Sequence, residues 1–163
     1  MKIDKLVKYY EDFPSKGTKY IDIQPLLENN MKFKFVIEKM GEMVKKPVFW
    51  IGVESRGFLF ASALSIKFGG GLKMIRKEGK LPGDNLLSID YSLEYGKDTI
   101  QIEKSIEKVN VVIVDDIFAT GGTLSASEKL CGLANYNVTD LLTFIDLNII
   151  VSKPQKLKSL YTL

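Results

Sequence analysis

The chain has 163 residues, which is the length of one globular domain. Hydrophobic residues make up 45% of it, and 23 basic against 20 acidic side chains leave a net charge of only +3. This composition excludes a disordered or fibrous chain. So small a charge gives no indication of a nucleic-acid partner.

Two scarce residue types narrow the possible chemistry. The chain has no histidine, which excludes Ser-His-Asp triads, Cys-His pairs, HExxH zinc helices and histidine proton shuttles. Its single cysteine, Cys131, excludes an internal disulfide and a cysteine-based zinc site. Any general acid or base is therefore an Asp, Glu, Lys or Tyr.

The hydrophobic segments are short. Residues 1–17 lack the apolar run of a secretory signal, and no stretch approaches the roughly 18 to 20 apolar residues that span a bilayer. Together with the lone cysteine, this predicts a protein of the reducing cytoplasm with no membrane partner.

Helix and strand patterns alternate along the chain. Apolar residues recur with helical spacing over 31–46, an apolar run at 48–53 predicts a strand, and 58–68 is apolar nearly all round, as in a buried helix. The remaining predicted elements are strands at 72–76, 111–114 and 138–145 and a helix at 123–134. This alternation predicts an α/β domain with a central, mostly parallel sheet flanked by helices. In such sheets ligands bind at the carboxyl ends of the strands.

The strongest functional signal is the segment VVIVDDIFATGGT at 111–123. A strand ends there in two carboxylates, Asp115 and Asp116, and a turn of small residues opens a helix. Converging amides and hydroxyls in such a turn suit a phosphate; here they come from Ala119, Thr120, Gly121, Gly122 and Thr123. Because the carboxylates repel a phosphate, they need sugar hydroxyls or a metal as partners. A phosphorylated ribose satisfies both halves of the motif.

Other known phosphate-binding motifs do not match this segment. It lacks the GxGxxG of a Rossmann fingerprint and the GxxxxGK[ST] of a Walker A loop. An ordinary helix N-terminus with turn glycines and solvated acids is the simplest alternative, and thirteen residues in this order are too specific for it.

The segment resembles the phosphoribosyl-pyrophosphate (PRPP) binding motif of the type I phosphoribosyltransferases. Further matching motifs extend the resemblance over residues 9 to 134: DFP at 12–14 with Gly17, DIQPL at 22–26, ESRGFLF at 54–60, IRKEGKLPG at 75–83 and SLEYGK at 92–97. The last two are typical of the adenine-specific branch. The resemblance implies a type I phosphoribosyltransferase fold in a single domain over 1–163. It also implies a small N-terminal hood at 1–30 over the base and a flexible catalytic flap at 83–100, a polar stretch without clear periodicity.

Roles for individual residues follow from this resemblance and from their local setting. Only two of the 23 basic residues are arginines, and both lie just past predicted strand ends, where a guanidinium suits a phosphate. The pyrophosphate ligands are then Ser55, Arg56, Arg76 and Lys80. Asp115 and Asp116 hold the ribose hydroxyls, and residues 119–123 hold the 5′-phosphate. The catalytic residues are Glu94, as general acid or base, with Arg56 and Lys80; Tyr95 belongs to the flap; Tyr20, Ile21 and Ile117 contact adenine.

The implied reaction joins adenine to PRPP, giving AMP and pyrophosphate with inversion at C1′. Mg²⁺ is expected to arrive on PRPP without a direct protein ligand, and the family implies a homodimer. Ile21 stands where many relatives carry Arg, and the segment after Asp146 matches poorly, so no catalytic role is assigned to it. Two alternatives stay open: a transferase for hypoxanthine or guanine, and a PRPP-sensing regulator without catalysis. A regulator usually needs a DNA-binding module or basic face.

Overall fold

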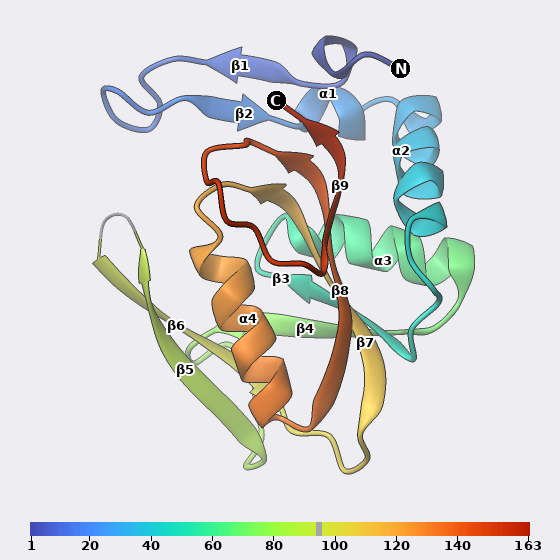
Figure 1. Cartoon of the computed structure of the whole chain (residues 1–163), viewed down its shortest axis with the longest axis vertical. Helices are drawn as coiled ribbons and strands as arrows, with labels where there is room; N and C mark the ends of the chain where they lie inside the picture. The colour runs from blue at the N-terminus through green and yellow to red at the C-terminus, as the bar shows by residue number, and fades with distance from the viewer. Residues whose placement is uncertain (94–95) are drawn as a thin grey trace.

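A seven-stranded sheet with helices on both faces forms the centre of the computed structural model, which describes residues 1–93 and 96–163 (Figure 1). Its strands are β3 (Phe49–Val53), β4 (Gly71–Lys77), β5 (Leu86–Leu93), β6 (Gly96–Glu103), β7 (Val109–Phe118), β8 (Tyr136–Asp146) and β9 (Leu157–Thr162). The spatial order is β5-β6-β4-β3-β7-β8-β9. The longer helices are α2 (Asn30–Glu42), α3 (Gly57–Phe68) and α4 (Gly122–Leu133).

Five neighbouring strands, from β4 through β9, run parallel, and β5 and β6 join as an antiparallel hairpin at the β4 edge. The central strand β7 is fully buried over residues 111–114. Its β-branched side chains suit a strand that is covered on both faces. The carboxyl ends of β3 and β7 consequently lie side by side, which brings the expected functional segments together.

Two hydrophobic cores lie on opposite faces of the sheet. One packs α2 and α3 against it, and the other packs α4 and the β5–β6 hairpin against it. Gly52 allows α3 to approach closely, because a Cβ there would lie 3.0 Å from the Phe58 backbone and 3.1 Å from the Ala61 side chain. The site-bearing ends of β3 and β7 are therefore held between two packed layers.

The N-terminal segment forms a separate cover beside this sheet. It consists of η1 (Ile3–Lys5), the antiparallel pair β1 (Lys8–Tyr10) and β2 (Tyr20–Asp22), and α1 (Gln24–Leu27). Buried side chains anchor it in the core on the α2–α3 face: Leu6, Ile21, Ile23 and Leu26. The Tyr161 hydroxyl of β9 also donates a hydrogen bond to the Met1 carbonyl at 2.8 Å, so the two ends of the chain meet here (Figure 1).

The predicted α/β architecture is confirmed, with differences at two segments. Residues 83–100, expected to lack regular structure, lie largely in the β5–β6 hairpin. Alternating apolar residues line its inner face: Leu87, Ile89, Ile100 and Ile102. The segment after Asp146 adds β9 as the parallel edge strand. In the described part of the chain, no helix is long and apolar enough to cross a membrane.

Phe144 on β8 joins three elements of the core on the α2–α3 face. It is fully buried, stacks on Phe60 of α3 at 5.7 Å and meets Tyr161 of β9 edge-on at 5.6 Å between ring centroids. We expect Phe144→Ala to lower the free energy of unfolding by about 3 to 5 kcal/mol, because it leaves a cavity in a packed core. Urea denaturation measures this. The control Leu133→Ala, at a side chain that is 61% exposed, should cost less than about 0.5 kcal/mol; equal losses would contradict the packing described.

Candidate active site

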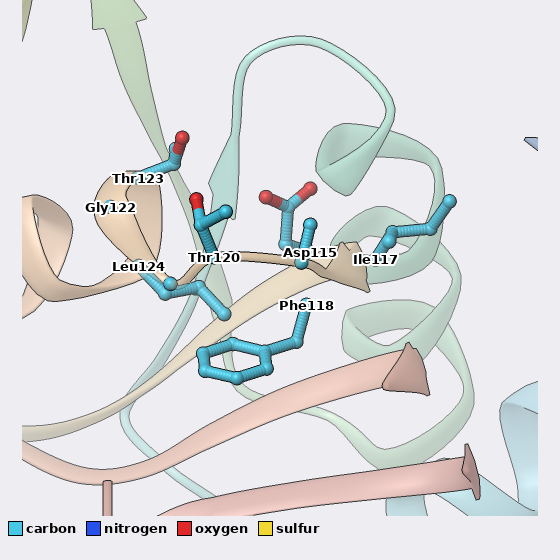
Figure 2. A pocket seen from close by; sticks show the side chains of 9 residues that line it. Asp115, Ile117, Phe118, Thr120, Gly122, Thr123 and Leu124 are labelled. Atoms are coloured by element: carbon cyan, nitrogen blue, oxygen red, sulfur yellow. The ribbon is translucent and has the colours of Figure 1, made fainter. Parts of the chain in front are cut away.

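A small pocket of about 80 Å³ opens between the end of β7 and the start of α4. The hydroxyls of Thr120 and Thr123 and the Asp115 carboxylate lie on one side of it, while Phe118 and Leu124 form its apolar floor (Figure 2). Ser127, fully buried one turn along α4, donates to the Thr123 carbonyl at 2.8 Å and so fixes the first turn of the helix. The free amides of that turn and the hydroxyls make this a pocket for a phosphate-sized anion.

Two glycines allow the loops around the pocket to adopt these positions. Gly121 has φ +80°, in the left-handed region that other residues avoid. Gly57, at the start of α3, lies so close to β7 that a Cβ would be 2.5 Å from the Val114 carbonyl and 3.2 Å from Asp115 Oδ1. The loop that leads into α3 is therefore pressed against the two carboxylates.

The adjacent carboxylates Asp115 and Asp116 occupy different surroundings. Asp115 is partly exposed and lines the pocket; its Oδ1 accepts the Asp116 amide at 2.9 Å. Burial, followed by the neighbouring Asp116 charge, raises its pKa well above the ordinary value. Asp116 is only 4% exposed, and burial raises its pKa although the Arg56 charge opposes the change. Asp115 therefore lines the pocket, and Asp116 is buried beside it with its Oδ2 against Arg56.

Arg56 connects Asp116 to the N-terminal segment. Its Nε lies 2.7 Å from Asp116 Oδ2, and its Nη1 donates to the Ile21 carbonyl at 3.0 Å and to the Tyr20 hydroxyl at 3.3 Å. The guanidinium also lies over the Tyr20 ring, 5.4 Å from its centroid. Arg56, predicted as a pyrophosphate ligand, is therefore already engaged with three groups of this chain.

Glu54 forms ion pairs with Arg76 and Lys80, the two other basic residues predicted to bind pyrophosphate. Its Oε1 lies 2.7 Å from Lys80 Nζ, its Oε2 lies 3.4 Å from Arg76 Nε, and Oε2 accepts the Lys77 amide at 2.8 Å. Burial raises the pKa of Glu54, but these three donors outweigh it and hold the pKa at about 2. Sequence reasoning assigned Glu54 no role, although an acidic residue two positions before Arg56 was a signal. Ser55, the remaining predicted ligand, is exposed on the same loop.

A larger cavity of about 710 Å³ adjoins the phosphate pocket, and Ala119 lines both. Its walls come from residues 14–15 and 17–19 of the N-terminal segment and from Leu147 and Ile149 after β8. The Leu147 amide donates to the Phe118 carbonyl at 2.9 Å, which holds this wall against the β7 end. Sequence reasoning missed it, because the wall follows the last motif that it used.

The three residues predicted to contact adenine lie in different surroundings. Ile21 is 5% exposed and packs in the core, while its carbonyl accepts a hydrogen bond from Arg56. Tyr20 packs between Arg56 and Phe13, whose ring centroid is 5.1 Å away, and Ile117 lines the phosphate pocket. The predicted flap residues Glu94 and Tyr95 lie outside the described residues. Within residues 1–93 and 96–163, no group of three or more Asp, Glu or Cys side chains is placed to hold a metal ion.

A phosphate-sized pocket beside two carboxylates, at the carboxyl edge of a parallel sheet, defines a protein that binds a phosphorylated sugar. Residues 21–160 match the model of the phosphoribosyl transferase domain, and the chain belongs to this family.

Similar proteins extend the match over nearly the whole chain. The adenine phosphoribosyltransferase of Carboxydothermus hydrogenoformans is 42% identical over 151 residues, covering 90% of this chain and 88% of that protein. Its counterpart in Mycoplasma mobile is 40% identical over 153 residues, covering 93% and 89%. The crystal structure of adenine phosphoribosyltransferase from Thermoanaerobacter pseudethanolicus has a TM-score of 0.91 at 35% identity, covering 99% of this chain and 98% of that one. The Saccharomyces cerevisiae protein, crystallised with adenine and an imino-altritol bisphosphate, has a TM-score of 0.86 at 31% identity, covering 94% and 93%.

The Glu54 network predicts a dependence of stability on pH. Since folding lowers the pKa of Glu54 from 4.5 to about 2, its carboxylate stabilises the fold above pH 4.5, and this contribution is lost as the pH falls from 4.5 towards 2. Glu54→Gln should cost about 1 to 2 kcal/mol of unfolding free energy near neutral pH and progressively less below about pH 4.

Urea denaturation at neutral pH and at about pH 3.5 measures the difference. Glu38→Gln is the matched control, because Glu38 is 50% exposed in its pair with Lys67 and should change stability by less than about 0.5 kcal/mol. A difference between wild type and Glu54→Gln that does not vary with pH would contradict the assignment.

Proposed function

We propose that this protein transfers the 5-phosphoribosyl group of PRPP to adenine, forming AMP and pyrophosphate. The observation that carries the proposal is the pocket of amides and hydroxyls at the start of α4, with Asp115 at its edge and Asp116 beside it. The adenine phosphoribosyltransferases similar to this chain over about 90% of its length support the choice of base. The protein then acts in purine salvage.

The phosphoribosyl group fits this site in one direction. The 5′-phosphate binds residues 119–123, where helix amides and the Thr hydroxyls point. The ribose 2′- and 3′-hydroxyls donate hydrogen bonds to Asp115 and Asp116. A phosphate at the same place would repel these carboxylates. The C1′ atom then faces the larger cavity beside Ala119, and the base lies between the N-terminal segment and Leu147.

The departing pyrophosphate lies on the loop formed by Ser55 and Arg56, beside Arg76 and Lys80. Because Arg76 and Lys80 pair with Glu54, their charges are held in place before the substrate binds, which lowers the cost of organising the site. Mg²⁺ enters as part of the PRPP substrate; when bound, it neutralises charge on the pyrophosphate oxygens. The partly exposed Asp115 carboxyl has the oxygen chemistry that such an ion accepts.

The bond from C1′ to the pyrophosphate oxygen breaks, and a bond from C1′ to a ring nitrogen of adenine forms on the opposite face, inverting C1′. The proton that leaves this nitrogen passes to Glu94, the general base predicted from the sequence, since the chain has no histidine. The hood at 1–30 and the flap at 83–100 exclude water from the reacting sugar. The family further suggests a cytoplasmic homodimer.

A panel of bases tests the proposed reaction. The purified protein is incubated with PRPP and Mg²⁺ and with adenine, hypoxanthine, guanine or orotate, and nucleotides are separated by chromatography. We expect AMP from adenine and no nucleotide from the other bases. A nucleotide from another base alone would overturn the substrate, and PRPP binding without any product would indicate a regulator instead of a transferase.

The assignment of Asp115 and Asp116 to the ribose hydroxyls gives a second prediction. Replacing both Asp115 and Asp116 with Asn should lower kcat/KM for PRPP by about 10² to 10⁴-fold, because the ribose hydroxyls lose two carboxylate acceptors and Arg56 loses its ion-pair partner. Thermal denaturation checks that the variant remains folded. Asp4→Asn, at an exposed carboxylate in η1, is the control and should retain wild-type turnover; unchanged kinetics in the double variant would remove the ribose assignment.

A further inference from the structure

Residues 147–156 connect β8 to β9 as an irregular segment that forms one wall of the larger cavity. Leu147 and Ile149 line that cavity, and the next residue, Ile150, packs against the core on the α4 face. A Cβ at Gly121 would lie 3.7 Å from Ile150 Cδ1, so the segment also runs beside the turn of the phosphate pocket. Because an irregular segment is not fixed by a ladder of backbone hydrogen bonds, its position depends on individual contacts.

The buried carboxylate of Asp146, the last residue of β8, organises the start of this segment. Asp146 is 4% exposed, its Oδ1 accepts the Asn148 amide at 2.8 Å, and its backbone carbonyl accepts the Leu163 amide at 2.9 Å. Asn148 has φ +55°, a left-handed conformation that Asn tolerates better than most residues, so the chain turns directly after the strand. Leu163 also lines the cavity, and hydrogen bonds to Asp146 therefore hold two parts of the cavity wall.

Lys153 closes the segment back onto Asp146. Its Nζ forms an ion pair with Asp146 Oδ2 and donates to the Asn148 side-chain oxygen at 2.8 Å. A carboxylate as buried as Asp146 needs such a partner, because an unpaired charge in the core is costly. The ammonium of Lys153 thus joins the two ends of the segment 146–153 and sets the path of the residues between them.

We propose that Lys153 is a positioning residue for the base: by pairing with Asp146, it keeps Leu147 and Ile149 in place as an apolar wall of the larger cavity. Apolar side chains of this kind suit the flat face of a purine. The inference rests on the proposed function, which places adenine in that cavity. Because the phosphate pocket and its carboxylates belong to other segments, Lys153 should affect ligands that carry a base and leave a ligand without one unaffected.

Calorimetric titration with two ligands tests the inference: AMP, which carries the base, and PRPP with Mg²⁺, which does not. Lys153→Met keeps an unbranched side chain and removes its charge. We expect it to weaken AMP binding by about 5- to 20-fold and to leave the affinity for PRPP within about twofold. In turnover assays KM for adenine should rise by a similar factor while KM for PRPP stays within about twofold. Lys153→Arg restores the charge and should bring AMP affinity back to within about threefold of wild type.

Lys156→Met is the matched control, because Lys156 lies on the same segment and pairs with Glu128 of α4 at 2.8 Å; it should change neither affinity. The double variant Asp146→Asn/Lys153→Met removes both charges of the buried pair, so it should be more stable to heat than Lys153→Met alone. Its AMP binding should still be weakened, because the connection across the segment is absent.

Equal weakening of AMP and PRPP in the Lys153→Met and double variants, or no weakening of either ligand, would overturn the inference. Wild-type binding and turnover would leave the proposed function intact in both cases. A wild-type protein that binds neither AMP nor PRPP would overturn the proposed function and the inference with it.

Discussion

The ion pair between Arg56 and Asp116 holds the parts of the site together. Three segments meet at it: the end of β7, the loop after β3, and the N-terminal segment that supplies the Ile21 carbonyl and the Tyr20 hydroxyl. Because Asp116 is 4% exposed, its charge depends on this partner, and removing either member would leave a buried charge without compensation. Arg is required there, because its planar fork donates in several fixed directions at once and the ammonium of Lys does not.

A second set of ion pairs organises the loop where the pyrophosphate would bind. Glu54 balances Arg76 and Lys80, so the loop that would receive a pyrophosphate is organised before any anion binds. Burial and the neighbouring Asp116 charge raise the pKa of Asp115. The site thus combines a pocket lined by the amides and hydroxyls of the β7–α4 turn with a rim on which Arg76 and Lys80 are held in place by Glu54.

Much of this arrangement was predictable because it is local in sequence. The strand at 111–114, the two carboxylates and the glycine turn follow one another directly, and their chemistry can be inferred from residue types and spacing.

Contacts between segments that are far apart in the sequence could not be predicted. Glu54 meets Lys80 26 residues later, and Arg56 meets Ile21 35 residues earlier; no periodicity encodes such pairings. The β5–β6 hairpin was missed because the segment was interpreted as a polar flap, although Leu87, Ile89 and Tyr91 alternate with Ser88 and Asp90.

A crystal structure of the protein with AMP bound would show whether the β7–α4 turn and its two carboxylates hold a phosphoribosyl group. We expect the 5′-phosphate on the amides of residues 119–123, both ribose hydroxyls on Asp115 and Asp116, and adenine in the cavity beside Ala119 and Leu147. A phosphate bound instead at Arg76 and Lys80, with the turn at 119–123 empty, would contradict it.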